Sequence, residues 1–222
     1  MAYPTLWETG DGRWTNSIRM IDRLGGLAGE YCKNHPVLAE MAEGVVCGTE
    51  APIIECDFGR TACVICFDLN FDELRHTYAA ARPDLILFSS MYHGGLMQQY
   101  WAYSCRSHFV SAIGNTFPSS IVSPVGHVLA SSTNYCSFVS AEVNLDCALV
   151  HLDGHRGKLQ AIRETYGTKA KVFDPGYLGS VLLSSETDDF TVNELIREFE
   201  LEPLDRYFAR SLAARRGTAT QC

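Results

Sequence analysis

Thr61-Ala-Cys-Val-Ile-Cys66-Phe-Asp-Leu-Asn-Phe71 is the stretch of this sequence that decides the fold. The residues up to Cys66 are β-branched, small or apolar, a pattern typical of a short buried strand. The next four residues break the pattern, and the range Phe71–Arg82 then predicts a helix, which Pro83 stops. Cys66 is therefore expected where a strand ends and a helix begins.

A thiol at the junction of a strand and a helix is expected to be reactive. The partial positive charge of a helix N-terminus lowers the pKa of such a thiol and favours the thiolate. The backbone N–H of Phe67 would be one of the unpaired donors of the helix start, free to bind an oxyanion. This is the geometry of a nucleophile elbow, with the sulfur of Cys66 in place of a serine oxygen. The alternative interpretation is a buried structural cysteine, the commoner role of a free thiol.

The composition of the chain is that of a globular protein and argues against several classes of partner. The 222 residues are enough for one sizeable core, and 46% of them are hydrophobic and 20% charged. A net charge of −8 argues against a surface for nucleic acids or anionic membranes. No apolar run has the length of a membrane span, and the N-terminal segment lacks the basic start and apolar centre of a secretory signal. We therefore expect a cytoplasmic protein that binds neither nucleic acid nor membranes.

Nine cysteines stand at irregular spacings. Their odd number and the missing secretory signal indicate reduced thiols, as in a cytoplasm. Cys63 and Cys66 form a Cys-x-x-Cys pair, which could suggest a metal or redox site. Residues three apart on a strand point to opposite faces, however, and no second such pair or nearby His pair completes a zinc site. Cys63 is therefore interpreted as a core residue, and the sequence predicts no metal and no cofactor.

Strand–helix–strand units come early in the chain and hairpins come later. Residues 1–14 are expected to be irregular. The expected strands are 16–22, 27–33, one that begins at 53, 85–90, 112–115, 120–122, 127–130 and 138–145. The expected helices are 37–41, 98–110, 153–166, one that begins at the capping box Thr191–Glu194 and one that Pro203 opens. This order predicts an α/β chain with a mixed sheet covered by helices on one side.

The end of the chain is expected to be a helical extension. We expect a first domain over residues 1–185 and the extension over residues 186–222. The last expected helix carries one apolar stripe, formed by Leu204, Tyr207, Phe208 and Leu212. The stripe has two interpretations: the helix packs on its own domain, or it is an arm that docks on a partner subunit. The sequence leaves both open.

Four motifs give the chain a resemblance to a known family. They are Tyr31-Cys-Lys-Asn-His35, Glu43-Gly-Val-Val-Cys-Gly48, Ile65-Cys-Phe-Asp-Leu-Asn-Phe71 and Ser123-Pro-Val-Gly126. From about Asn16 to about Asp146 the sequence resembles the carbon–nitrogen hydrolase (nitrilase) superfamily. The resemblance implies an α-β-β-α sandwich in which two subunits pair and extend the layers. It therefore implies a homodimer or a larger homo-oligomer.

The resemblance also implies a chemistry. Enzymes of this superfamily cleave non-peptide carbon–nitrogen bonds through a cysteine thioester, and Cys66 matches their nucleophile. Lys33 would supply a cation to the tetrahedral oxyanion, together with the backbone N–H of Phe67. Glu43 matches the second glutamate of the family, which orients the lysine and helps to move protons. A thiolate, a fixed cation, a backbone donor and a carboxylate are the groups that such a reaction needs. The implied substrate is a small-molecule amide.

The first glutamate of the family, the general base, has no counterpart upstream of Lys33. Glu8 lies in a segment that matches another part of the family pattern. Glu30 is three residues from Lys33 on a strand and should point to the opposite face. We therefore expect an N-terminally shortened member of the family, in which the first strands and helices of the domain are missing and hydrolysis is impaired. The shortening has three interpretations: a fragment, an alternative start or a degenerate paralogue.

The residues after Cys66 indicate the branch of the superfamily. Phe67 and Asp68 stand where nitrile-cleaving members usually have Trp-Glu, which favours the amidase-like branch. Leu69 and Asn70 occupy places where enzymes for N-carbamoyl amino acids often carry arginines, so an acidic substrate is less favoured.

Two other functions stay open. One is a non-catalytic module that keeps the fold for binding or assembly, favoured by the missing base. The other is an unrelated cysteine hydrolase that uses a Cys–His pair, for which His35, His93 and His108 are the candidate bases.

Overall fold

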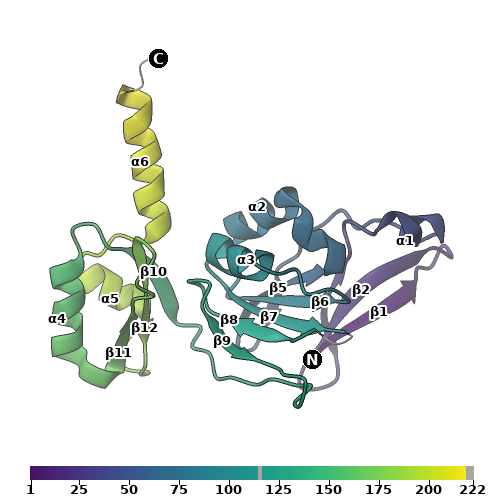
Figure 1. Ribbon diagram of the computed structural model, residues 1–222, viewed down its shortest axis with the longest axis horizontal. Helices are drawn as coiled ribbons and strands as arrows, with labels where there is room; N and C mark the ends of the chain where they lie inside the picture. The colour runs from purple at the N-terminus through teal and green to yellow at the C-terminus, as the bar shows by residue number, and fades with distance from the viewer. Residues whose placement is uncertain (115–116, 219–222) are drawn as a thin grey trace. The chain divides into compact units, whose positions relative to one another are not determined.

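The computed structural model describes residues 1–114 and 117–218, and Figure 1 shows its helices and strands. The chain forms two compact units, Met1–Val143 and Asn144–Cys222, each with a hydrophobic core of its own. The expected domain boundary, between residues 185 and 186, does not coincide with this division. The reason is that the strands after Asn144 pair with one another and not with the earlier sheets.

The first unit contains two sheets. An antiparallel sheet holds β1 (Ala2–Glu8), β2 (Trp14–Ile21) and β3 (Leu27–Cys32). A mixed six-stranded sheet holds, in spatial order, β4 (Ile54–Cys56), β5 (Gly59–Ile65), β6 (Leu85–Ser90), β7 (His108–Ile113), β8 (Ser120–Val122) and β9 (Val128–Ser131). Strands β5, β6 and β7 are parallel, and the outer neighbours pair antiparallel. The sheet is therefore mixed, as the sequence predicts.

The helices of the first unit are α1 (Leu38–Ala42), the 3-10 helix η1 (Cys66–Asn70), α2 (Asp72–Ala81) and α3 (Met97–Cys105). α2 joins β5 to β6 and α3 joins β6 to β7, the crossovers that parallel neighbours require. Both helices lie on the same face of the large sheet (Figure 1). The Tyr78 hydroxyl on α2 donates to the carbonyl of Cys63 (2.9 Å), and Trp101 Nε1 on α3 donates to the carbonyl of Leu69 (2.9 Å). These bonds fix both helices to the region of Cys66.

Strand β5 is buried along most of its length. Every residue from Thr61 to Ile65 is buried, and such a continuous run is typical of a parallel strand covered on both faces. Ile18 of β2 and Tyr31 of β3 belong to the same core cluster as the β5 residues, so the smaller sheet contributes to this core. Cys63 is fully buried, as expected, and burial raises the pKa of its thiol to about 12.

The predicted helix 98–110 is too long. α3 ends at Cys105 because Arg106 takes a left-handed conformation (φ 59°), which interrupts the helical backbone. The chain from His108 onward is β7, paired in parallel with β6. The expected strand 112–115 is the end of β7, and Asn115 lies outside the described residues.

Two other expectations about strands are wrong. Residues 1–14 are not irregular, because β1 pairs with β2 across a turn in which Gly12 has a φ of 82°. Residues 138–145 form no strand, and the next strand is β10 (Cys147–His151). The strand lies later than expected because residues 147–151 are the ones that pair with β12 (Ser180–Ser185).

The second unit is a small antiparallel sheet with helices. Its strands follow the spatial order β10, β12 and β11 (Ala170–Phe173). Its helices are α4 (Arg156–Tyr166), the 3-10 helix η2 (Gly167–Lys169), α5 (Val192–Glu198) and α6 (Leu204–Thr218). The predicted capping box is present, since Thr191 N donates to Glu194 Oε2 (2.7 Å) and Glu194 N donates to Thr191 Oγ1 (3.3 Å).

The apolar stripe of α6 is buried only at its start. Leu204 is buried, and the ring of Tyr207 stacks on His151 with centroids 3.5 Å apart. Phe208 and Leu212 are 41% and 55% exposed. The first turn therefore anchors α6 to the second unit, and apolar side chains beyond it are in part exposed. Across the described residues, no helix combines the length and the hydrophobicity needed to span a bilayer.

Candidate active site

Cys66 is the first residue after β5 and the first residue of η1, so the strand ends where the sequence predicts. Its φ is 48°, in the left-handed region that non-glycine residues rarely adopt. Strained backbone of this kind is concentrated at functional sites. The thiol is half-buried at the edge of the core. The helix that follows it directly is the five-residue η1, and α2 begins only at Asp72, so the helix N-terminus beside the thiol is a short one.

Asp68 is fully buried two residues after Cys66 and accepts hydrogen bonds on both oxygens. Oδ2 accepts from the Tyr31 hydroxyl (2.7 Å) and from the backbone N–H of Ile65 (3.2 Å). Oδ1 accepts from the backbone N–H of His35 (2.7 Å) and lies 3.1 Å from Nδ1 of the same residue. Burial raises the pKa of Asp68, and these donors offset part of the rise because they favour the charged form.

Lys33 directly follows β3 and is almost completely buried. Its Nζ lies 2.5 Å from Oε2 of Glu40. Glu40 also accepts from the backbone N–H of Val37 (2.7 Å) and from Nδ2 of Asn16 (2.8 Å). Burial alone would raise the pKa of Glu40, but the hydrogen bonds from Lys33, Val37 and Asn16 outweigh it and lower the pKa. The lysine is therefore held as one half of an ion pair.

Glu43, the expected partner of Lys33, lies elsewhere. It is exposed and follows the last residue of α1, where its backbone N–H bonds to the carbonyls of Ala39 and Glu40. The reason is the length of α1: Glu40 stands in the first turn, so its carboxylate folds back to the helix start beside Lys33, whereas Glu43 is already past the last turn. The structure brings Lys33 to Glu40 and does not bring it to Glu43.

The backbone of Lys33 is fixed on both sides. Its N–H donates to the carbonyl of Asn16 (2.8 Å), and its carbonyl accepts from the N–H of Gly48 (2.8 Å). A Cβ at Gly48 would overlap the carbonyl oxygen of Cys32, so only glycine allows this approach of the two backbone segments. The hydrogen bond between Lys33 and Gly48 thus joins the two ends of the loop that carries Glu40 and Glu43.

Lys33 and Cys66 are connected through Asp68. The carboxylate binds Tyr31 and His35, which flank Lys33 in sequence, and Ile65, which precedes Cys66. Within residues 1–114 and 117–218, no hydrogen bond or ion pair joins Lys33 to Cys66 directly. Glu30, which the sequence predicts to point away from the lysine, pairs with Arg19 (3.6 Å).

Asn70 and Tyr92 lie beside the Cys66 turn. Nδ2 of Asn70 donates to the carbonyl of Phe67 (3.0 Å) and to the hydroxyl of Tyr92 (3.1 Å). Burial raises the pKa of Tyr92, and negative charge at Cys66 and Asp68 raises it further. Phe67, whose N–H is the expected oxyanion donor, is itself 38% exposed.

The three histidines that could form a Cys–His pair are placed differently. Nδ1 of His35 faces Asp68, and its ring stacks on Phe71 with centroids 3.8 Å apart. Nδ1 of His93 accepts from the N–H of Gly95 (3.1 Å). His108 is buried in β7, and burial lowers its pKa to about 4. Across the described part of the chain, none of the three shares a hydrogen bond with Cys66.

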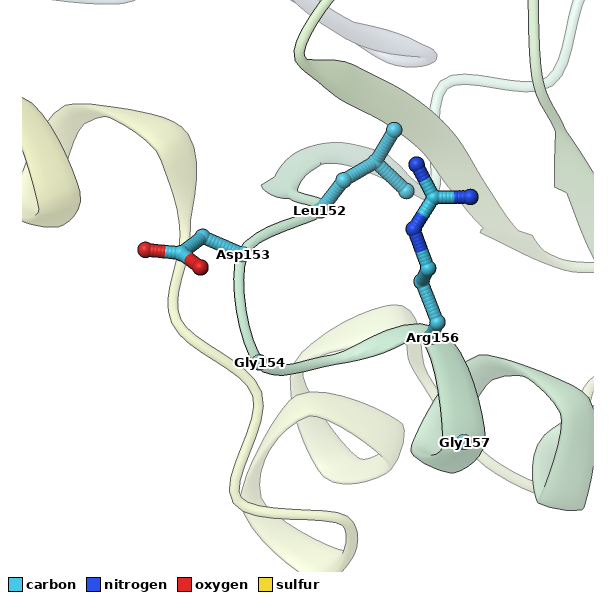
Figure 2. A pocket seen from close by; sticks show the side chains of 5 residues that line it. All are labelled: Leu152, Asp153, Gly154, Arg156 and Gly157. Atoms are coloured by element: carbon cyan, nitrogen blue, oxygen red, sulfur yellow. The ribbon is translucent and has the colours of Figure 1, made fainter.

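An open hollow lies at the start of α4 in the second unit and is lined by Leu152, Asp153, Gly154, Arg156 and Gly157 (Figure 2). The side chains of Asp153 and Arg156 point in different directions there. The Asp153 carboxylate accepts a hydrogen bond from the Tyr207 hydroxyl (3.0 Å). None of the predicted site residues lines this hollow.

Glu40 and Asp68 are not among the site residues that the sequence predicts, although Glu40 pairs with Lys33 and Asp68 connects the segments of Lys33 and Cys66. Glu40 carries a usable signal, because an acidic residue three places after Val37, at a helix start, tends to fold back onto the first N–H. Asp68 carries a weaker one: it is the one acidic residue in the stretch Thr61–Phe71.

Comparisons with known proteins agree with the resemblance that the motifs give. Residues 1–166 match the sequence model of the carbon–nitrogen hydrolase family. No curated protein matches the chain. Among solved structures, the chain is similar to a carbon–nitrogen hydrolase from Helicobacter pylori G27, with a TM-score of 0.59 and 14% identity over 74% of this chain and 64% of that one. It is also similar to Nit3 from Saccharomyces cerevisiae, a member of branch 10 of the nitrilase superfamily, with a TM-score of 0.53 and 19% identity over 60% of this chain and 54% of that one.

A third similar structure is a mutant of the amidase from Nesterenkonia sp. AN1, which shows covalent addition of the acetamide moiety of fluoroacetamide at the active site cysteine. Its TM-score is 0.53 and its identity 17%, over 60% of this chain and 56% of that one. The chain thus spans only 54% to 64% of the length of these three proteins. The likeness confirms the α/β fold of carbon–nitrogen hydrolases. Because the family match covers most of the sequence, the chain belongs to the carbon–nitrogen hydrolase family.

Proposed function

We propose that this chain hydrolyses the carbon–nitrogen bond of a small neutral amide through a thioester on Cys66. The observation that supports this most is the backbone of Cys66, which has a φ of 48° directly after β5, a buried parallel strand of a carbon–nitrogen hydrolase fold. A similar amidase carries the acetamide moiety of fluoroacetamide on its active site cysteine, which supports a nucleophilic cysteine, although this adduct is not itself a thioester.

The reaction has two halves. The Cys66 thiolate attacks the carbonyl carbon, and the electron pair moves to the carbonyl oxygen, where the Lys33 ammonium and the Phe67 N–H stabilise it. Collapse of this adduct breaks the carbon–nitrogen bond, and the nitrogen leaves with a proton as ammonia or an amine. Water then attacks the thioester, the carbon–sulfur bond breaks, and a carboxylic acid and the free thiol are formed.

Both halves need a group that moves protons, and the carboxylates of this chain are poorly placed for it. Glu30 pairs with Arg19, Glu40 pairs with Lys33, and Glu8 and Glu43 are exposed. Among the described residues, no carboxylate is hydrogen-bonded to Cys66. Glu40 is the better candidate for proton transfer because it lies beside Lys33. Glu43 is a candidate only because its position in the sequence matches the second glutamate of the family. We expect slow turnover, because a positioned base typically contributes about 10²–10⁴-fold in rate.

Alkylation tests the nucleophile separately from turnover. Iodoacetamide at pH 7, followed by peptide mass spectrometry, should label Cys66 at least about tenfold faster than the exposed Cys136, and Lys33→Met should slow the labelling. Ammonia release from acetamide or propionamide should be slow, and Cys66→Ala should abolish it. Labelling no faster than at Cys136, or hydrolysis that survives Cys66→Ala, would contradict the proposal.

A second candidate function is a binding or assembly module that has kept the fold without catalysis. Glu30 and Glu40 are already held in ion pairs, with Arg19 and Lys33, and this favours a chain without a general base. This candidate predicts fast labelling of Cys66 with no ammonia release above that of Cys66→Ala, so the same two measurements separate the candidates.

A further inference from the structure

The Asp68 carboxylate joins two segments that are far apart in sequence. It is fully buried, and it accepts from Ile65, next to Cys66, and from Tyr31 and His35, on either side of Lys33. The Tyr31 hydroxyl in turn accepts from the backbone N–H of Asn34 (3.3 Å). A single side chain thus holds the turn of the proposed nucleophile and the segment of the proposed oxyanion cation.

The position suits a carboxylate. Both oxygens face donors, two at Oδ2 and the His35 backbone N–H at Oδ1, and a carboxylate is the side chain that only accepts. Asparagine has nearly the same shape but carries an NH₂ group in place of one oxygen. Its NH₂ would point at either Tyr31 and Ile65 or the N–H of His35, so Asp68→Asn loses bonds without changing the volume of the core.

We propose that Asp68 is a positioning residue that fixes the separation of Lys33 from Cys66, and that through it the lysine charge acts on the thiolate. This rests on the proposed function, because it presumes that Cys66 is the nucleophile and Lys33 the cation. Asp68 is buried and does not touch the substrate. Its effect passes through the backbone of Ile65 on one side and through Tyr31 and His35 on the other.

A double-mutant cycle tests the coupling on the full chain. The rate of Cys66 alkylation by iodoacetamide is measured at several pH values for the parent, Lys33→Met, Asp68→Asn and the double variant. Lys33→Met removes an opposite charge, which lowers a pKa by about one to three units, so it should slow labelling at pH 7 by about tenfold and move the labelling midpoint to higher pH. Asp68→Asn removes a negative charge, which by itself would favour the thiolate, so the slower labelling and higher midpoint that we expect in this variant would report the displaced lysine. If Asp68 acts through Lys33, the double variant should be within about twofold of the slower single variant. Rates that multiply would overturn the proposal.

A second pair of variants keeps the test valid if Asp68→Asn fails to fold. Tyr31→Phe removes one donor to Asp68, whereas Tyr78→Phe removes an equally buried hydroxyl that donates to the carbonyl of Cys63. Tyr31→Phe loses the bond to Asp68 and the longer one from the N–H of Asn34, and Tyr78→Phe loses one bond, so Tyr31→Phe should be the less stable of the two. Tyr31→Phe should slow Cys66 labelling several-fold and raise its pH midpoint, and Tyr78→Phe should leave both unchanged. Equal labelling in the two variants would overturn the proposal.

The same data separate this inference from the proposed function. Slow labelling of Cys66 in the parent chain, at the rate of Cys136, would overturn both, because there would be no activated thiolate to position. Fast labelling in the parent, with Lys33→Met slow and Tyr31→Phe equal to Tyr78→Phe, would leave the proposed function standing and overturn only the role of Asp68.

Discussion

The ammonium nitrogen of Lys33 lies 2.5 Å from Oε2 of Glu40, seven residues further along the chain. The pair is local, and the N–H of Val37 at the start of α1 holds the same oxygen (2.7 Å). The lysine therefore meets its carboxylate within one loop, whereas its link to Cys66 depends on the long-range contacts of Asp68. The ion pair of the lysine and its distance from the nucleophile therefore depend on two different carboxylates, Glu40 and Asp68.

Glu40 and Glu43 should differ in what they contribute to stability. Glu40→Gln leaves the buried Lys33 without its charged partner and should lower the free energy of unfolding of the first unit by about 2 kcal/mol. Glu43→Gln changes an exposed side chain and should stay within about 0.5 kcal/mol of the parent. Urea unfolding followed by tryptophan fluorescence measures this unit, because all three tryptophans lie in it. A larger loss for Glu43→Gln would show that Glu43 holds the lysine in solution.

His108 should make the first unit less stable in acid. Burial lowers its pKa to about 4 in the folded chain, against about 6.5 in the unfolded chain. Between these values the unfolded chain binds a proton that the folded chain does not, so stability falls as the pH falls from about 6.5 to about 4. The fall amounts to about 3 kcal/mol and levels off below pH 4.

Unfolding curves at pH 7, 5.5 and 4 test the contribution of His108. His108→Gln should flatten the dependence on pH, and His76→Gln, at an exposed position of α2, should retain the dependence of the parent. An equally steep loss of stability in His108→Gln would mean that another group is responsible.

The exposed part of α6 should contribute to self-association, if the chain forms the homo-oligomer that the family resemblance implies. Phe208→Ser with Leu212→Ser removes apolar side chains that are 41% and 55% exposed, and should lower the molar mass measured by light scattering. Ala209→Ser with Ala213→Ser is the matched control on the same helix. An unchanged mass in the first variant would show that the stripe serves only its own domain, and a monomeric parent would rule out the homo-oligomer.

The sequence predicts β5 and the turn at Cys66 well, because an uninterrupted apolar run followed by a break is a local signal. The end of α3 is different: Arg106 takes the left-handed conformation without the glycine that usually marks it. β1 is hard to find for another reason. Most of its side chains are exposed, so the alternation of buried and exposed residues that identifies a strand is missing.

The site is predicted in part. Cys66 and Lys33 can be identified from motifs. The choice between Glu40 and Glu43 depends on how the five-residue helix α1 turns the side chain of its third residue, Glu40, back to the helix start. The burial of Asp68 depends on Tyr31 and His35, more than thirty residues away, and such contacts leave no periodic signal in a single sequence.

Gly48 affects how sequences related to this one should be compared. Its N–H holds the carbonyl of Lys33, and any side chain at this place would push against the carbonyl of Cys32. A homologue could therefore retain Lys33, Glu40 and Cys66 and still have its lysine displaced by one methyl group at a position with no chemistry of its own. The presence of the reactive residues does not suffice to infer a working site, and an alignment should also be checked for the glycine that gives the lysine its place.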